Sequence, residues 1–382
     1  MSEQPFLHTL RSRLDACRAK GLGRSLLPVS ARRGGTVVAD GRPCLDFCSN
    51  DFLGLGRDPD LSRRLAALCR DQSAGAGASR LVTGSSVSLL KAEEALARYF
   101  GYEACLLFSS GFLANLTLVS ALFSSRDAIA ADKRIHASLM AGIRHSRAAF
   151  HTFRHNDLDH LEKILARRPV TAVCTESLFS MDADSPDFGR LKTLKDRHDF
   201  FCITDEAHTF GVLGDRGRGL GHGAADVAVG TLGKAFGFFG SFVLMPETVR
   251  EYLIHFGQGF IYTTAPPPWH GDMVLALLER IWAANDRRAR LREIGDMARD
   301  LLRSAGFSVR GRHHILALET GDEAGCQALA ETLRRRGILV LAARYPTVPL
   351  GRAMLRICLT SDHQPADLLR LRDALAAATE SP

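Results

Sequence analysis

The alternation of short apolar runs with amphipathic stretches constrains the fold of this chain most strongly. The apolar runs have the length and composition of buried strands, and the stretches between them repeat apolar residues at helical spacing. This order predicts a mostly parallel sheet with helices on both faces, in which ligands bind beyond the carboxyl ends of the strands. We predict strands at 103–108, 128–131, 149–153, 170–175, 200–204, 227–230 and 242–245.

Polar residues follow several of these strands. Ser180, Asp205, His208 and Lys234 all fall at or just beyond a predicted strand end. Lys234 lies in a glycine-rich bend between two apolar runs, where desolvation would favour the neutral, nucleophilic amine that an aldehyde cofactor requires. A lysine in a surface loop beside a bend explains the same pattern, so the position alone leaves both interpretations open.

Asp205 follows FFCIT, a strongly apolar strand. A buried carboxylate is costly unless it pairs with a positive group, and a protonated pyridine nitrogen would supply that charge. His208 could then bond a ring hydroxyl and His136 could stack on a flat ring, although each alone is equally a capping or core histidine. The chain has no HExxH and no CxxC segment, so we expect no metal site.

The turn Ser109-Ser110-Gly111 joins a predicted strand to a predicted helix. Small residues at such a turn leave free backbone N–H groups at the helix N-terminus, which is an arrangement that binds phosphate. Many strand–helix turns are simply tight, so this signal is weak when taken alone.

Composition narrows the class of protein. The 382 residues suggest about two domains, and 46% hydrophobic with 24% charged residues is typical of a globular protein. No apolar run is long enough to cross a bilayer, and residues 1–20 lack the features of a signal peptide, so we expect a cytoplasmic protein. The net charge of +7 leaves nucleic-acid binding open as an alternative, but the chain has no concentrated basic arm.

Periodicity suggests three parts. Residues 1–49 predict an N-terminal helix followed by an arm with a hairpin, residues 50–270 hold the alternating strands and helices, and residues 271–382 predict a smaller domain. A single long helix is expected from about 269 to 304, where it would connect the second part to the third.

Motifs in a shared order and spacing run from about Leu14 to His363. They are SNDFLGLG (49–56), GASRLVTG (77–84), SSGFLAN (109–115), HASL (136–139), HND (155–157), ESLFSMDAD (176–184), DEAHTFGVLGDRGRG (205–219), TLGKAFG (231–237), IYTTAPPP (261–268) and RYPTVPLGRAMLRICLT (344–360). In these segments the chain resembles the α-oxoamine synthases, a pyridoxal-phosphate family of fold type I. The resemblance implies an aspartate-aminotransferase-like α/β fold with a central, mostly parallel, seven-stranded sheet and a smaller α+β C-terminal domain.

The resemblance also implies roles for the residues at the strand ends. Lys234 would form the Schiff base with pyridoxal 5'-phosphate and remove the substrate Cα proton. Asp205 would pair with the pyridinium nitrogen, His208 would contact the phenolic oxygen, and His136 would stack on the ring. Ser180 would lie near an oxygen or the phosphate of the cofactor.

Further contacts are implied for the phosphate and the substrates. The backbone groups of Gly111 and Phe112 and the hydroxyl of Thr231 would hold the phosphate. The hydroxyls of Thr263 and Thr264 would reach it from the neighbouring subunit of an obligate homodimer with shared active sites. Arg356 would bind the amino-acid carboxylate, for which a guanidinium is suited. Asn50 and Arg24 would line the entrance for the acyl substrate.

Members of this family are acyltransferases that join an amino acid to an acyl thioester, carried by CoA or a carrier protein, with loss of CO₂. The SRLVTG and PTVP segments are most similar to the members that use L-alanine and a pimeloyl thioester in biotin biosynthesis. Glycine with a short acyl-CoA, serine with a long acyl chain, an autoinducer-type aminoketone synthesis and a non-catalytic family subunit are the alternatives. The chain departs from the family pattern at Phe52, where tyrosine is usual, and at Leu89 on the acyl-substrate side, where histidine is usual.

Overall fold

The computed structural model describes residues 4–379, and its contacts divide the chain into two compact units. One unit contains the residues up to 49, residues 181–183 and those from 290 onward, and the other contains residues 50–180 and 184–289. Each unit is described by itself below. The three-part division at 49/50 and 270/271 stays a prediction, and its outermost residues, 1–3 and 380–382, lie outside the described part of the chain.

The larger unit is built on a seven-stranded sheet within the described residues, in the order β4-β10-β9-β8-β7-β5-β6. Strand β10 runs antiparallel to both of its neighbours, and the pairs among β5 to β9 are parallel, as the sequence pattern predicts. The strands are β4 (Ala104–Phe108), β5 (Ala128–Asp132), β6 (Ala149–Phe153), β7 (Ala172–Glu176), β8 (Phe201–Asp205), β9 (Val227–Thr231) and β10 (Ser241–Met245).

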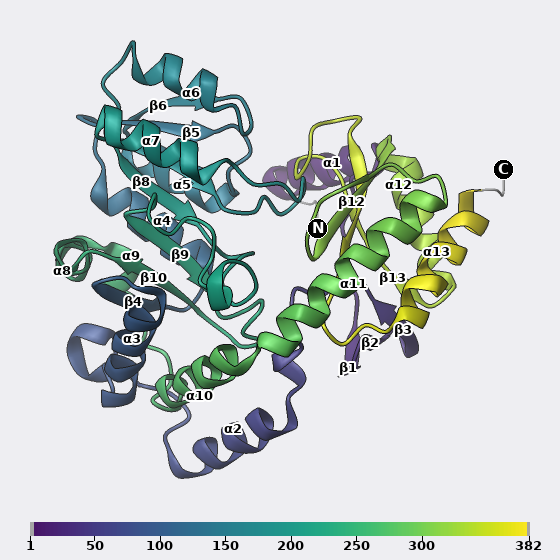
Figure 1. Cartoon of the computed structure of the whole chain (residues 1–382), viewed down its shortest axis with the longest axis horizontal. Coiled ribbons are helices and arrows are strands. Elements are labelled where there is room, and N and C mark those ends of the chain that lie inside the picture. Colours follow the sequence, from purple (N-terminus) through teal and green to yellow (C-terminus); the bar gives the residue numbers. More distant parts are fainter. Residues whose placement is uncertain (1–3, 380–382) are drawn as a thin grey trace. The chain divides into compact units, whose positions relative to one another are not determined.

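Helices cover both faces of this sheet, as Figure 1 shows. Alternate residues of the strands point to opposite faces, so Ala172 and Cys174 pack with α4 and α5 while Val173 packs with α6 and α7. The helices of the unit are α2 (Pro59–Asp71), α3 (Val87–Phe100), α4 (Gly111–Leu122), α5 (Ala137–Ser146), α6 (Leu158–Leu165), α7 (Phe188–His198), α8 (Glu247–Phe256), α9 (Gln258–Ile261) and α10 (Trp269–Ala283).

The single long helix expected at 269–304 is wrong, because the structure has two helices there, α10 and α11 (Asn285–Ser304). Ala284 leaves the helical conformation at ψ 27°. The guanidinium of Arg288 donates to the carbonyl oxygens of Ile281 at 2.9 Å and Gly211 at 3.2 Å. The buried Arg288 thus bonds the carbonyl oxygen of Ile281 at the end of α10. If the helix continued, a backbone N–H would bond this oxygen instead.

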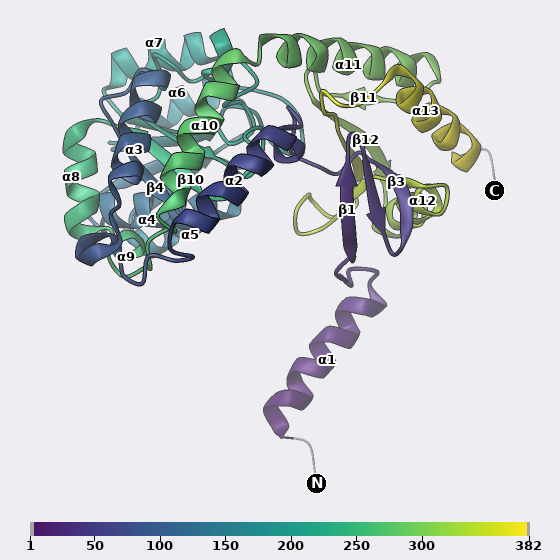
Figure 2. The same ribbon diagram turned by 90° about the horizontal axis from the view of Figure 1, so that it is seen from below.

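The smaller unit is α+β and contains two four-stranded sheets, in the orders β1-β2-β3-β13 and β11-β12-β15-β14. Helix α1 (Pro5–Ala19) has no buried residue, and Figure 2 shows it projecting from the strands of its own unit. The other elements are β1 (Val29–Arg33), β2 (Thr36–Ala39), β3 (Arg42–Asp46), β11 (Val309–Arg310), β12 (Ile315–Gly321), α12 (Glu323–Arg335), β13 (Ile338–Leu339), β14 (Leu341–Ala343), β15 (Ala353–Cys358) and α13 (Pro365–Thr379).

A buried ion pair anchors the glycine-rich stretch before α3 to the sheet. Arg80 donates to both carboxylate oxygens of Glu93, at 2.8 and 3.0 Å, and both side chains are almost fully buried. Glu93 also accepts a hydrogen bond from the backbone N–H of Leu107 in β4 at 2.8 Å. The pair therefore fixes the strand that leads into the Ser109–Gly111 turn.

Glu93→Gln should lower the free energy of unfolding by about 3–5 kcal/mol, because the Arg80 guanidinium would stay buried without its counter-charge. Glu94→Gln, at an exposed position of the same helix, is the matched control and should change stability by no more than about 0.5 kcal/mol. Urea unfolding of the three proteins measures the difference. Equal stabilities of the two variants would contradict the assigned role of the ion pair.

Candidate active site

The carboxyl ends of the central strands bring the predicted site residues to one edge of the sheet. Asp205 is the last residue of β8 and lies opposite Glu176 of β7 in the parallel ladder. On the other side, Ser241 of β10 pairs with Thr231 at the end of β9 and with Phe108 at the end of β4. Because the strand ends are in register, the turns that follow them begin next to one another.

Lys234 lies in the turn between β9 and β10, and its Nζ is 2.8 Å from Nε2 of His208. The turn closes through a hydrogen bond from the N–H of Gly237 to the carbonyl of Lys234 at 2.8 Å. Gly237 has a φ of +64°, and a Cβ there would collide with the backbone of Gly56. The positive φ and the close approach to Gly56 both require glycine at position 237. The turn that carries Lys234 is therefore held by a tight backbone contact.

Asp205 is buried, and its side chain accepts two hydrogen bonds within the described residues. Asn115 Nδ2 donates to Oδ2 at 2.7 Å, and the N–H of Ala207 donates to Oδ1 at 2.9 Å. Burial and the Asp205 carboxylate raise the pKa of the adjacent Glu176 far above its usual range, against the opposing charge of Lys234. Burial beside Asp205 therefore favours the protonated form of Glu176.

His136 caps the N-terminus of α5 and remains exposed on its outer side. Its Nδ1 lies 2.7 Å from the hydroxyl oxygen of Ser138 and accepts the backbone N–H of that residue at 3.3 Å. Partial desolvation lowers the pKa of His136; Asp205 opposes this and the positive charge of Lys234 adds to it. The ring is therefore neutral at pH 7 and has an open surface.

The N-terminus of α4 lies at the same edge of the sheet. The Ser110 hydroxyl accepts the N–H of Leu113 at 3.3 Å, while the space around Gly111 contains no other atom within 4 Å of an added Cβ. Thr231 is already engaged, because its hydroxyl donates to Gly240 O at 3.2 Å and accepts from Gly233 N at 3.1 Å. To donate a hydrogen bond to a phosphate, the Thr231 hydroxyl would have to give up its bond to Gly240 O.

The remaining predicted residues are divided between the two units. Thr264 forms a β-bridge with Ser79 of its own chain. Arg24 is exposed and Arg356 is buried in β15, both on the smaller unit. Asn50 and Ser180 are half-buried residues of the larger unit, as Thr263 is. Their predicted roles, like those of the other site residues, stay predictions.

The two departures from the family pattern are both in the core. Phe52 is fully buried, and its ring centroid is 6.0 Å from that of His208. Leu89 is fully buried in α3, where its backbone N–H lies against Gly271 of α10. In this chain, position 89 therefore serves the packing of two helices.

The residues at the strand ends fit pyridoxal phosphate. They offer an amine (Lys234), a buried carboxylate that can hold a proton on a ring nitrogen (Asp205) and a neutral flat ring with an open side (His136). The helix N-terminus at Gly111 supplies N–H donors for an anion. Each chemical group of the cofactor thus has a matching group in the protein.

Comparison with known proteins identifies the family. The family model described as aminotransferase class I and II matches residues 42–375. The chain belongs to this family. A curated relative from Chromobacterium violaceum, named 8-amino-7-oxononanoate synthase, is 41% identical over 355 residues, which cover 91% of this chain and 93% of the relative.

Solved structures of class I and II aminotransferase relatives have the same fold. Serine palmitoyltransferase from Sphingomonas wittichii superposes with a TM-score of 0.92 at 26% identity and covers 100% of this chain and 99% of its own. The 8-amino-7-oxononanoate synthase of Francisella tularensis has a TM-score of 0.78 at 29% identity and covers 88% and 98%. The predicted resemblance and fold class are confirmed. Within residues 4–379, no helix has both the length and the apolar character to span a membrane.

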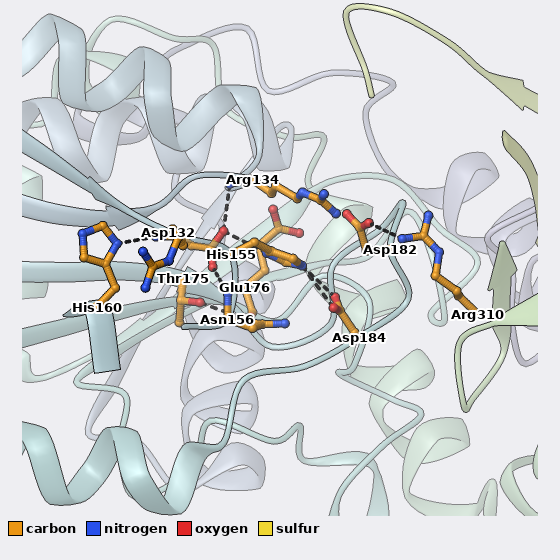
Figure 3. Close-up of polar contacts among 11 residues, drawn as sticks. Asp132, Arg134, His155, Asn156, His160, Thr175, Glu176, Asp182, Asp184 and Arg310 are labelled. Atoms are coloured by element: carbon orange, nitrogen blue, oxygen red, sulfur yellow. Dashed lines mark hydrogen bonds and ion pairs between the residues drawn. The ribbon is translucent and has the colours of Figure 1, made fainter. Parts of the chain in front are cut away.

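Sequence reasoning from the residues overlooked a second polar cluster, shown in Figure 3. His155 bridges two acids, with Nδ1 3.0 Å from Asp132 Oδ1 and Nε2 3.1 Å from Asp184. Asp132 is fully buried and also accepts the backbone N–H groups of Arg134 and Asn156. The signal lies in the HND and ESLFSMDAD segments, which carry the histidine and one of the two acids, but the sequence alone does not show that these residues meet.

The His155 cluster holds the loop that carries Ser180. Within this loop the carbonyl oxygen of Asp184 accepts the N–H of Phe179 at 2.9 Å, and the rings of His155 and Phe179 meet edge to face at 4.5 Å. Burial would lower the pKa of His155, but the hydrogen bonds and charges of Asp132 and Asp184 outweigh it and raise the pKa to about 9. The bridge is therefore an imidazolium between two carboxylates at neutral pH.

His155→Gln should reduce the free energy of unfolding by about 1–3 kcal/mol at neutral pH, the contribution of hydrogen bonds between charged groups. Because the pKa of His155 is higher in the folded than in the unfolded protein, its protonation stabilises the folded state. This stabilisation is complete below the unfolded-state pKa of about 6.5 and is lost as the pH rises through the folded-state pKa. The stability difference between wild type and His155→Gln should therefore shrink as the pH approaches about 9.

Urea unfolding at a series of pH values measures this difference. Asp184→Asn, which keeps the size of the side chain, should weaken the pH dependence and move its midpoint to lower pH. A difference between wild type and His155→Gln that does not vary with pH would show that His155 is not bridging the two acids as a cation.

Proposed function

We propose that this class I and II aminotransferase family member is an 8-amino-7-oxononanoate synthase, a pyridoxal-phosphate-dependent acyltransferase. It would condense L-alanine with a pimeloyl thioester and release CO₂ and the thiol carrier, a step of biotin biosynthesis. The observation that carries the proposal is the amine of Lys234 against His208, at the same strand edge as the buried Asp205. The substrates follow from curated relatives of that name at 35–41% identity.

Pyridoxal phosphate, when bound, supplies an electron sink that makes the Cα proton of an amino acid removable. Lys234 would bind its aldehyde carbon, Asp205 its ring nitrogen, His208 its phenolic oxygen and His136 its ring face. The N-terminus of α4 at Gly111 and Phe112 would hold the phosphate, together with Thr231 and with Thr263 and Thr264 of a second subunit. Ser180 would approach a cofactor oxygen.

Lys234 moves the proton in this scheme. In its neutral form, Nζ of Lys234 would take the Cα proton of the amino acid and return a proton to the product carbon. His208 Nε2, 2.8 Å from Nζ, would orient the amine, while the carboxylate of Asp205 would favour a positive charge on the ring nitrogen of the cofactor. The protonated Glu176 adds no second negative charge beside Asp205.

Arg356 would hold the carboxylate of L-alanine with a bidentate bond. Asn50 and Arg24 would line the entrance for the acyl thioester, carried by CoA or by a carrier protein. We further propose a cytoplasmic homodimer with shared sites, since two phosphate contacts are assigned to a partner.

Lys234→Ala should abolish the visible absorbance of cofactor held as a Schiff base and lower the condensation rate by at least about 10³-fold, since both the covalent link and the base are lost. Absorbance after incubation with pyridoxal phosphate and release of free thiol measure the two effects. Lys163→Ala, an exposed lysine on α6, is the control and should match wild type. Retention of the absorbance in Lys234→Ala would rule out Lys234 as the attachment point.

A panel of amino acids crossed with acyl thioesters tests the substrate assignment. L-Alanine with pimeloyl thioester should be among the best pairs, with turnover followed by CO₂ release. Serine with a long acyl chain is the competing pair, favoured by the TM-score of 0.92 to serine palmitoyltransferase. If that pair is preferred, the biotin assignment is wrong although the reaction class stands.

A further inference from the structure

A chain of hydrogen bonds joins His136 to Asp205 through two side chains that the proposed mechanism does not use. Asn115 of α4 donates to Asp205 at 2.7 Å and to the hydroxyl oxygen of Ser138 at 2.9 Å. Ser138 of α5 in turn lies 2.7 Å from His136 Nδ1. Both linking side chains are almost completely buried.

Close packing of α4 and α5 makes this chain possible. Gly142 of α5 lies against α4 so tightly that an added Cβ would be 2.8 Å from Val119 and 3.1 Å from the carbonyl of Asn115. Figure 1 shows the two helices on the same part of the sheet. Their approach places the short side chains of Asn115 and Ser138 within hydrogen-bonding distance of each other.

The chemistry of each group fixes the direction of the hydrogen bonds. The Asp205 carboxylate only accepts, so the atom of Asn115 facing it is the amide nitrogen, and the second N–H of that nitrogen goes to Ser138 Oγ. The Ser138 O–H remains for His136 Nδ1, which the Ser138 backbone N–H also approaches. Two donors converge on Nδ1, so the proton of the neutral ring is on Nε2.

The geometry assigns Asn115 and Ser138 as positioning residues, which hold His136 in the neutral Nε2–H tautomer and fix the orientation of the Asp205 carboxylate. The inference rests on the proposed function insofar as His136 and Asp205 bind the cofactor. Its effect would be that the ring stacked on the cofactor presents a proton outward from Nε2 and carries no charge.

Stability alone does not account for Asn115. Within the described residues its Oδ1 is buried and makes no hydrogen bond, and an unsatisfied buried carbonyl oxygen is destabilising. The amide therefore acts through its two N–H donors and not through its carbonyl oxygen. These donors both point along the chain toward His136 and Asp205.

Several charged groups face His136 and bear on its titration. They are Asp205 from β8, Glu176 from β7, which accepts the backbone N–H of His136, and Lys234 from the turn after β9. Burial favours the protonated form of Glu176, and the charges of Asp205 and Lys234 act on the pKa of His136 in opposite directions. The hydroxyl of Ser138 then provides the specific interaction that favours a ring without a proton on Nδ1.

Ser138→Ala tests one end of the chain in the full-length protein labelled with ¹³C,¹⁵N-histidine, with and without pyridoxal phosphate. NMR shifts of the imidazole nitrogens report which one carries the proton, and His136→Gln identifies the signals. The wild type should show the Nε2–H form alone. In Ser138→Ala the Nδ1–H form should appear and the proton affinity of His136 should rise about fivefold, the value of one ordinary hydrogen bond. Ser146→Ala, a buried serine of the same helix bonded to Ile143 O, is the control and should leave His136 unchanged.

Asn115→Leu tests the other end. Loss of a hydrogen bond to a carboxylate should weaken pyridoxal phosphate binding about tenfold or more, measured as its dissociation constant by absorbance. Thr117→Val removes a buried hydroxyl from the same helix and should leave the dissociation constant unchanged. If Asn115→Leu does not fold, Asn115→Ser shortens the side chain and should give the same direction of change.

The outcomes separate the two proposals. A wild-type His136 that carries its proton on Nδ1, or a tautomer and titration unaffected by Ser138→Ala, would overturn the positioning role whether or not cofactor binds. A wild type that binds no pyridoxal phosphate would refute the proposed function, while the NMR result on the same protein would still decide the state of His136.

Discussion

The burial of one carboxylate organises the rest of the larger unit. Asp205 ends an apolar strand, and a negative charge there is tolerated only if donors and a cation surround it. The protein supplies two donors, from Asn115 and Ala207, and its burial of the adjacent Glu176 raises the pKa of that carboxyl and favours the protonated form. A positively charged ring nitrogen completes the set, which is the electrostatic reason why a pyridinium cofactor suits this strand end.

The fold could be predicted from the sequence because the alternation of apolar runs and helical repeats is long and regular. Lys234, His208 and Asp205 were found because residues just beyond parallel strands converge whatever the details of packing. The break between α10 and α11 was missed because neither glycine nor proline marks it. Helix α10 ends instead where the buried Arg288 of α11 bonds the carbonyl oxygen of Ile281, and such a contact between helices leaves no local signal in the sequence.

The side chains that orient the site were also missed. Asn115 lies in the middle of an apolar helix, GFLANLTLVSAL, where a single amide resembles an incidental substitution. Its partner Ser138 is 23 residues away on another helix, and only the close approach at Gly142 brings the two together. Periodicity reports which face of a helix is buried, but it does not report which polar group on that face meets another.

The contact between Gly56 and Gly237 has a consequence for how this protein can vary. A Cβ on Gly56 would be 2.8 Å from the carbonyl oxygen of Gly237, so the SNDFLGLG and TLGKAFG segments touch backbone to backbone. A rotamer change cannot relieve a substitution on either side, because the atom nearest to an added Cβ belongs to the backbone of the opposite glycine in each case. A segment taken from a relative must therefore be transplanted together with the segment that it contacts. If only one of the two is changed in sequence or length, the amine of Lys234 will shift relative to the cofactor ring.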